Sequence, residues 1–111
     1  MDTITFEDFN KVDIRMGTVV SADVPEWSHW VTKLTVDLGK EIGERIIFAG
    51  IMKYYKPEEL IGKQFPFVVN ITPKKIGSEG DYSNGMMLAA GNDRSYIFQL
   101  QEIVANGTKV R

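Results

Sequence analysis

A polar segment between two apolar runs, within residues 65–90, is the part of the sequence best suited to hold a ligand. It carries Asn70, Lys74, Lys75 and Ser83, together with several turn residues. An amide, two ammonium groups and a hydroxyl bring cationic and hydrogen-bonding chemistry to one place. The flanking runs have the length of β-strands, so strands would hold the ends while an exposed loop carries the chemistry.

The composition argues against several other kinds of site. The 111-residue chain has no cysteine and a single histidine, His29, so disulfides, thiolate or His-based metal sites and a Ser-His-Asp triad are not expected. We therefore expect no metal or other cofactor. The N-terminal residues lack the features of a signal peptide, and no apolar run approaches the ~20 residues of a membrane span. These observations predict one soluble, cytoplasmic domain over residues 1–111.

The charges are unevenly distributed along the chain. The net charge is −2, which argues against nucleic-acid binding over the whole surface. Acidic residues dominate before Trp30, and basic residues dominate from there to Lys75. A surface polarised in this way attracts a polyanion locally, although a solvated mixture of charges accounts for the same pattern.

The first elements that could position the polar segment are a helix and a strand. Thr5 opens a capping-box pattern, which predicts one short helix that ends near Lys11 and turns its two phenylalanines toward the core. Apolar and polar residues alternate from Val12 to Val24, with Val20 on the apolar face. This alternation predicts a long strand with one buried face and a bulge or bend at Gly17.

The rest of the chain predicts further strands and a short helix. Lys33 to Leu38 and Arg45 to Ile51 read as a hairpin, whose second strand should be central because it is more continuously apolar. A single helical turn is expected from Lys56 to Gly62. The remaining predicted elements are strands at 65–71, 86–90 and 96–100 and a tight turn at 106–107. This all-β pattern predicts an OB-fold, a roughly five-stranded Greek-key barrel with short helices.

Two aromatic groups have alternative interpretations. Trp27 and Trp30, in the loop after the first long strand, suit stacking on bases or sugars, a subunit contact, or packing at a barrel mouth. Tyr54 and Tyr55, beside Lys53, either contact phosphates and bases or anchor the short helix to the barrel. Residue types and spacing leave these alternatives open.

Several motifs together resemble a known family. They are DIRMG (13–17), AGI (49–51), YKPEELIGK (55–63), VNITPKKI (69–76) and GMMLAA (85–90). The chain resembles the tRNA-binding domain found at the C-terminus of many bacterial methionyl-tRNA synthetases, in EMAP-II-like synthetase cofactors and in free-standing proteins. The resemblance implies a free-standing, non-catalytic OB-fold domain that binds tRNA or similar structured RNA, is usually a homodimer, and has an aminoacyl-tRNA synthetase as a candidate partner.

The resemblance also implies which residues contact RNA. They are Asn70, Lys74, Lys75, Ser83 and Met86, with Lys33 and Lys53 as supporting bases. In these roles the lysines neutralise phosphates, while amide and hydroxyl groups hydrogen-bond a base edge or a 2′-hydroxyl. The methionine offers a soft apolar surface under a base.

Three segments depart from the family pattern. The loop at 27–34 lacks most of the family's motif, and Asn84 stands where the family has glutamate. Glu79 and Asp81 add negative charge beside the two lysines. At an exposed site each carboxylate would weaken phosphate attraction by a few tenths of a kcal/mol to ~1 kcal/mol.

A second branch is also similar to this chain. The segments DLG (37–39), EIG (41–43) and NGT (106–108) resemble the CsaA branch of dimeric, export-related chaperones. That branch implies unfolded peptide as the ligand, which is our alternative function. An enzyme ranks third, since no phosphate-cradling glycine loop and no acid, base and nucleophile set is identifiable in the sequence.

Overall fold

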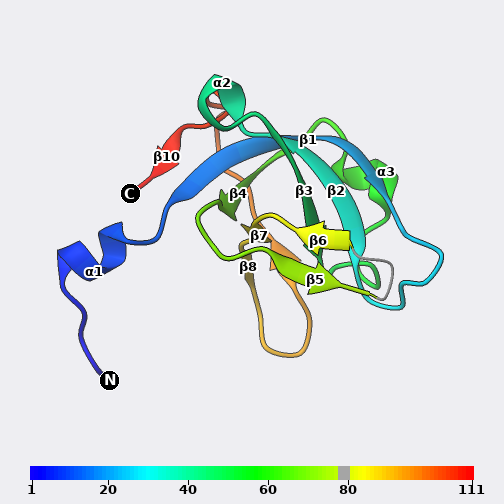
Figure 1. Cartoon of the computed structure of the whole chain (residues 1–111), viewed down its shortest axis with the longest axis horizontal. Helices are drawn as coiled ribbons and strands as arrows, with labels where there is room; N and C mark the ends of the chain where they lie inside the picture. The colour runs from blue at the N-terminus through cyan, green and yellow to red at the C-terminus, as the bar shows by residue number, and fades with distance from the viewer. Residues whose placement is uncertain (78–80) are drawn as a thin grey trace.

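The structure is a computed structural model that describes residues 1–77 and 81–111. Glu79, which the sequence places near the two lysines, lies outside the described residues. The element order is α1 (Phe6–Asn10), β1 (Ile14–Asp23), β2 (Thr32–Asp37), α2 (Gly39–Ile42), β3 (Glu44–Ala49), α3 (Pro57–Leu60), β4 (Gln64–Val68), β5 (Lys74–Ile76), β6 (Asp81–Ser83), β7 (Met86–Met87), β8 (Ala89–Ala90), β9 (Tyr96–Ile97) and β10 (Lys109–Val110) (Figure 1). Within the described ranges, no helix has the length and apolar character needed to cross a membrane.

The main sheet is built around β1. Its hydrogen-bonded order is β3-β2-β1-β4-β7, and β10 also pairs with the start of β1. The first three strands form a meander, after which the chain passes through α3 and returns as β4 on the other side of β1. This is a Greek-key path. Because β3 also contacts β6 and β7, the sheet nearly closes into a barrel, and the predicted OB-fold is confirmed.

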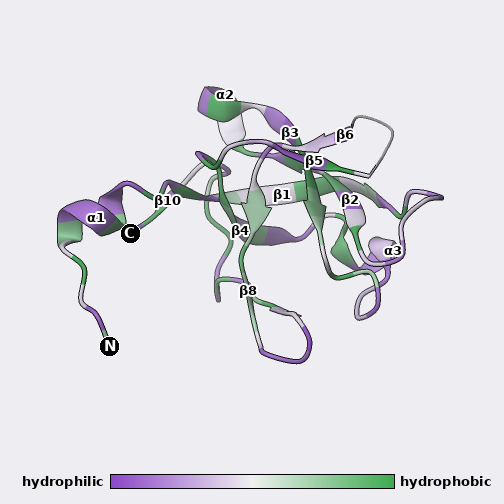
Figure 2. Ribbon diagram, turned by 60° about the horizontal axis from the view of Figure 1, so that its bottom comes forward, coloured by the Kyte–Doolittle hydropathy of each residue, from purple (hydrophilic) through white to green (hydrophobic). Residues whose placement is uncertain are grey.

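The core lies between the inward faces of these strands. Buried and half-buried residues alternate along β2, as the period-two pattern predicted, and β4 is buried along its whole length. Hydrophilic residues gather in the loop after β8 and on much of α1, away from the central strands (Figure 2). The largest fully buried side chains are Phe65, Phe67, Met16, Leu34, Leu38, Ile47, Ile51 and Leu60.

The N-terminal helix has the predicted start but not the predicted packing. Thr5 Oγ1 accepts a hydrogen bond from the Asp8 N–H at 3.1 Å, which caps α1. The helix projects from the barrel and contains no buried residue, and Phe6 is 75% exposed (Figure 1). The prediction that both phenylalanines face the core is therefore wrong, because the helix extends beside the barrel instead of packing on it.

The irregularity in β1 lies beyond the predicted residue. The register with β2 shifts between Val19 and Ser21. Val19 is fully buried whereas Val20 is 42% exposed, the reverse of the predicted pattern, and Val20 is the extra residue at the register shift. Gly17 instead permits a close approach of strands, since a Cβ there would lie 2.6 Å from Val36 Cγ1.

Strand β3 lies at one end of the hydrogen-bonded order, not in the middle as predicted. The segment after β5 covers its outer edge. The Asn84 N–H donates to Ile46 O at 2.9 Å, and the Phe48 N–H donates to Ser83 Oγ at 2.9 Å. The backbone N–H and carbonyl groups on this edge of β3 are therefore bonded partly by a side chain. The pattern of apolar residues in the sequence does not reveal such a bond.

The loop between β8 and β9 is held by aromatic rings. The guanidinium carbon of Arg94 lies 4.7 Å from the ring centroid of Tyr54, 5.5 Å from that of Tyr55 and 4.4 Å from that of Tyr96. The Ile97 N–H also donates to Tyr55 Oη at 3.4 Å. Tyr54 and Tyr55 thus anchor this loop. Strand β9, which follows it, is shorter than the predicted strand at 96–100.

Candidate functional site

A pocket of about 250 Å³ lies between the β5–β6 hairpin, the end of β3 and the loop before β2. We call it the Lys74 pocket. Most of its lining is apolar and comes from segments far apart in the sequence. Its lining includes the side chains of Trp30, Phe48, Ile71, Lys74, Ser83 and Met86.

The β5–β6 hairpin separates the two lysines that the sequence places together. Lys74 pairs with Ser83 across the hairpin, and Lys75 pairs with Tyr82. Because successive side chains of a strand point to opposite faces, Lys74 faces the pocket while Lys75 faces away from it, beside Tyr82. The two exposed ammonium groups therefore do not act on one surface.

Ser83 is buried and its hydroxyl already has partners. Its Oγ accepts from the Phe48 N–H at 2.9 Å and donates to Gly85 O at 3.0 Å. The hydroxyl thereby joins the hairpin to β3 and fixes one wall of the pocket. Its predicted contact with RNA stays a prediction, and the positioning role is the one that these bonds describe.

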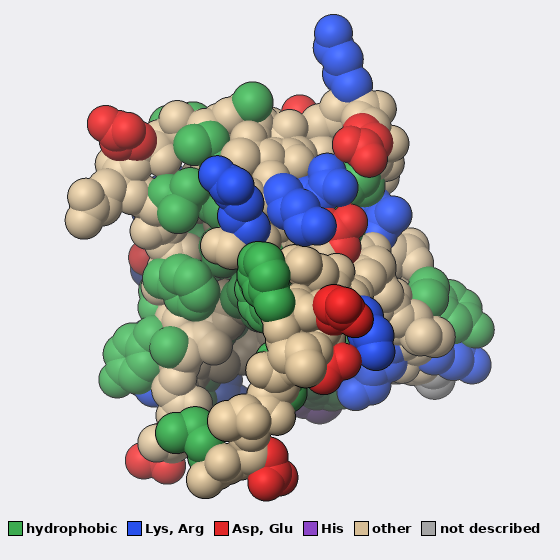
Figure 3. All heavy atoms as spheres, turned by 90° about the vertical axis from the view of Figure 1, so that its left-hand side faces the viewer, with side chains coloured by type: hydrophobic (Ala, Val, Ile, Leu, Met, Phe, Trp, Pro, Cys, Tyr) green, Lys and Arg blue, Asp and Glu red, His purple; other side chains and the backbone are tan. Residues whose placement is uncertain are grey.

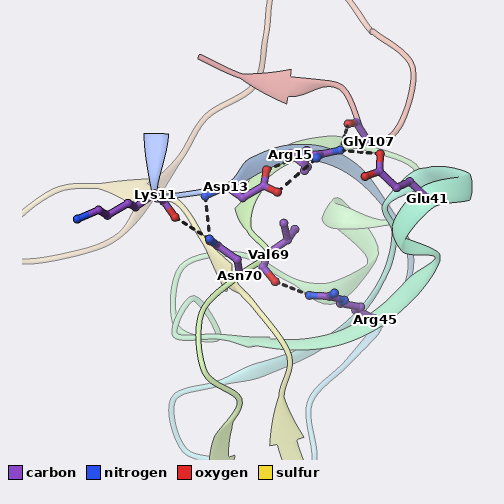
Figure 4. Close-up of polar contacts among 8 residues, drawn as sticks. All are labelled: Lys11, Asp13, Arg15, Glu41, Arg45, Val69, Asn70 and Gly107. Carbon is purple, nitrogen blue, oxygen red and sulfur yellow. Dashed lines mark hydrogen bonds and ion pairs between the residues drawn. The ribbon is translucent and has the colours of Figure 1, made fainter. Parts of the chain in front are cut away.

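Asn70 also uses its side chain inside the protein. Its Oδ1 accepts from the Asp13 N–H at 2.9 Å, and its Nδ2 donates to Lys11 O at 2.6 Å (Figure 4). The amide thus ties the segment after β4 to the linker between α1 and β1. It lines a neighbouring hollow of about 580 Å³, together with Arg45, and not the Lys74 pocket. The chain reaches the pocket one residue later, at Ile71.

The charge of Arg15 is neutralised internally. Its Nε lies 2.7 Å from Asp13 Oδ1, and its Nη1 lies 3.3 Å from Glu41 Oε2 and 3.1 Å from Gly107 O (Figure 4). The hydrogen bond from the Asp13 carboxylate raises the pKa of Arg15 above its usual range. This guanidinium therefore joins β1, α2 and the turn before β10, and its charge is compensated within the fold.

The two tryptophans, whose roles the sequence left open, take different positions. The Trp27 ring centroid lies 6.1 Å from that of Phe48 and 6.3 Å from that of Trp30, the second contact being edge-on at 63°. A Cβ on Gly77 would lie 3.0 Å from Trp27 Cη2, so the end of β5 packs against this ring. Trp27 is thus a packing residue, whereas Trp30 is 50% exposed and lines the Lys74 pocket.

The remaining predicted contact residues are Met86, Lys33 and Lys53, and one of them lines the Lys74 pocket. Met86 is 44% exposed and belongs to the lining. Lys33 stands directly opposite Phe48 on the neighbouring strand, so it lies close to the pocket wall. Lys53 is exposed in the turn after β3 and is not among the residues lining the two hollows above. Trp30 was absent from the predicted set, and its signal was the unusual Trp-Ser-His-Trp loop.

Charge on other faces is mixed. Basic side chains gather on the face that carries α1 and the C-terminus, where acidic side chains lie beside them (Figure 3).

Among the residues that the structure describes, no group of three His, Cys, Asp or Glu side chains is arranged to hold a metal ion. Among the described residues lining the Lys74 pocket, by contrast, lysine is the sole charged type.

Residues 14–109 match the model of a family described as a putative tRNA binding domain. The chain belongs to the tRNA-binding domain family. It is 43% identical over 109 residues to the methionine–tRNA ligase of Methanococcoides burtonii, covering 96% of this chain and 16% of that enzyme. It is 45% identical over 113 residues to the methionine–tRNA ligase of Clostridium tetani, covering 99% of this chain and 17% of that enzyme. The chain thus spans a small part of these relatives, and the resemblance predicted from its motifs is confirmed.

Two solved structures of tRNA-binding-domain relatives have the same fold. The MetRS-related protein from Pyrococcus horikoshii superposes with a TM-score of 0.90 at 35% identity, covering 100% of both chains. The chaperone CsaA from Bacillus anthracis superposes with a TM-score of 0.88 at 34% identity, covering 99% of this chain and 100% of that one. The fold of this domain is therefore shared by a synthetase-related protein and by a chaperone.

Proposed function

We propose that this chain binds tRNA or similar structured RNA without catalysing a reaction on it. The observation that carries the proposal is the composition of the Lys74 pocket. It offers an ammonium group for a phosphate, and Trp30 and Met86 offer flat and soft apolar surfaces for a base. The family's description as a tRNA-binding domain supports the same ligand.

The test is binding of bulk tRNA from low to physiological salt. We expect micromolar to sub-micromolar binding at low salt that weakens as salt rises, because each phosphate contact releases counterions. The chain's net charge of −2 makes strong binding over the whole surface unfavourable, so a small number of local contacts should set the slope. Absence of binding at low salt, or binding without a salt slope, would contradict the proposal.

Single-lysine variants locate the contact. Lys74→Ala should reduce the salt slope by roughly 0.7–0.9, the share of one phosphate contact. Lys75→Ala removes an equal charge from the opposite face of β5 and should have a smaller effect. Lys63→Ala is the matched control, since Lys63 is exposed just before β4 and does not line the Lys74 pocket. Equal losses in all three variants would indicate diffuse attraction and not a site.

We also propose a homodimer that serves an aminoacyl-tRNA synthetase. Exposed apolar side chains support the first part, since Phe6 is 75% exposed, Leu100 49% and Ile103 85%. The similarity to parts of methionine–tRNA ligases supports the second. A sedimentation mass near the 12.6 kDa of one chain at micromolar concentration would exclude the homodimer. Unchanged charging of tRNA by a methionine–tRNA ligase when the chain is added would contradict the synthetase link.

Binding of unfolded peptide is the second candidate function. The likeness to the chaperone CsaA favours it, and the apolar side chains of Phe48, Ile71 and Met86 in the pocket would accept an apolar side chain of a peptide. It predicts that the chain suppresses aggregation of an unfolded protein and that tRNA does not compete. Competition between tRNA and such a client therefore distinguishes the two candidates.

A further inference from the structure

We propose that the Lys74 pocket takes one unpaired nucleobase, which stacks on Trp30 and rests against Met86 while its phosphate lies on Lys74. The proposal deepens the RNA-binding function above and rests on it. It names the feature of the RNA that the pocket recognises, and it assigns a role to the tryptophan whose function the sequence left open.

The size of the pocket limits its occupant. About 250 Å³ is available, below the roughly 300–1,000 Å³ of pockets for drug-sized ligands. One planar ring fits such a space. In an RNA duplex the bases are also stacked and their major-groove edges are out of reach, so a base that enters a pocket comes from a loop, a bulge or an end.

Trp30 is held in place while half of its surface stays open. Its backbone N–H donates to Ser28 Oγ at 3.3 Å, and its backbone carbonyl oxygen accepts from the Met52 N–H at 3.3 Å. Trp27 supports it edge-on, with 6.3 Å between the ring centroids. Because the side chain is 50% exposed and its backbone is fixed at both polar atoms, the indole can stack on a base with little further loss of conformational freedom.

The separation between the stacking residue and the lysine is also set by packing. Trp27 lies between Trp30 and the end of β5, where a Cβ on Gly77 would lie 3.0 Å from its ring. Phe48 also packs against Trp27, and the Phe48 N–H donates to Ser83 Oγ on the hairpin. The loop that carries the indole and the strand that carries Lys74 are therefore joined through one packed ring.

The chemistry of the walls favours a nucleotide over an apolar peptide side chain. An apolar side chain would satisfy the aromatic and aliphatic walls but would leave the Lys74 ammonium beside it without a counter-charge. A nucleotide supplies a planar ring and a phosphate together. Lysine is the only charged type among the described residues of the lining, although Asp81, opposite Ile76, places one carboxylate on the same face of the hairpin.

The experiment compares Trp30→Ala and Trp30→Phe, using as probes an RNA hairpin with an unpaired loop and a blunt duplex of equal length. We expect Trp30→Ala to weaken hairpin binding by about 5- to 150-fold, the value of one stacked base, without changing the salt slope. Trp30→Phe should keep most of the affinity. The control is Tyr82→Ala, which removes an exposed ring from the opposite face of the hairpin and should bind as the wild type does.

A fluorescence measurement keeps the test decisive if Trp30→Ala folds poorly. A single-stranded oligonucleotide should quench tryptophan emission of the wild type by stacking on Trp30. Trp30→Phe retains Trp27, which is covered by Phe48, and should bind the same oligonucleotide with little quenching. Equal quenching in both proteins would overturn the proposal.

The outcomes distinguish a failure of the proposed base pocket from a failure of RNA binding itself. If Trp30→Ala binds the hairpin like the wild type while Lys74→Ala loses affinity, RNA binding stands and the base pocket is wrong. If the wild type binds the duplex and the hairpin equally, the pocket does not read an unpaired base. If Trp30→Ala loses only an unfolded peptide client, the occupant is a peptide. Failure of the wild type to bind any RNA at low salt would overturn the proposed function itself.

Discussion

Replacing Ser83 by alanine should lower stability substantially. The substitution leaves the Phe48 N–H, now bonded at 2.9 Å, without a partner in a buried place, and it removes the donor to Gly85 O. A buried polar group without a partner costs ~1–3 kcal/mol. The lost bond to the Gly85 carbonyl should cost less than the unpaired Phe48 N–H, because a carbonyl oxygen has a second lone pair. The free energy of unfolding should therefore fall by about 2 kcal/mol. Out of a usual total of ~5–15 kcal/mol, this is a large change.

Urea unfolding followed by tryptophan fluorescence measures the effect, since Trp27 packs against Phe48 and reports on the same region. The midpoint should fall while the dependence on urea stays the same, which indicates a change in stability alone. Ser21→Ala is the matched control, because Ser21 is exposed on β1, and it should stay within ~0.5 kcal/mol of the wild type. A Ser83→Ala protein that is as stable as the wild type but has lost RNA affinity would refute this reasoning and make the hydroxyl a direct contact.

Three other substitutions test the packing. Gly17→Ala should lower the free energy of unfolding by ~1–3 kcal/mol, because its Cβ would lie 2.6 Å from Val36 Cγ1 and 2.7 Å from Leu38 Cδ2; a change under 0.5 kcal/mol in urea unfolding would contradict this. Thr32→Val should raise the midpoint of thermal unfolding, by about 1 kcal/mol in free energy, because the buried hydroxyl has no hydrogen-bond partner among the described residues; a lower midpoint would show that the hydroxyl is satisfied. Arg94→Ala should speed amide hydrogen exchange in the β8–β9 loop while exchange in β2 stays unchanged, because it removes cation–π contacts of about 0.5–2 kcal/mol; unchanged loop exchange would mean that the tyrosines order the loop alone.

The elements that the sequence predicted well are those with local signals. Thr5 caps α1 through its own side chain, and Pro57 begins α3. The alternation of β2 needs only neighbouring residues, and the turn at 106–107 places Gly107 at a φ of 92°. In each case, the determining interaction lies within a few residues of the signal.

The features that the sequence did not predict depend on contacts between distant segments. The exposure of Val20 follows from a register shift against β2, and the position of β3 follows from how the barrel closes. The burial of Ser83 depends on a donor 35 residues away. A serine or an asparagine has the same sequence signal whether its polar group faces a ligand or its own backbone, so residue type alone could not separate contact from support.

The opposite orientation of the two lysines is an intermediate case. Alternation along a strand is a local rule, so Lys74 and Lys75 had to point to different faces once that segment was a strand. Which of them faces the pocket depends on pairing with β6, where Lys74 meets Ser83. The sequence predicted a loop for this segment and not a strand. It therefore could not predict which lysine faces the pocket.

The amide of Asn70 has a consequence for the order of folding. Its two hydrogen bonds join segments 57 and 59 residues apart, so they close a long loop of chain. Long-range contacts carry an entropic cost, which is lower once the intervening structure has brought the two segments together. The linker that carries α1 should therefore be fixed after β1 and β4 have paired. In unfolding, we expect residues 1–13 to be released while the rest of the barrel is still intact.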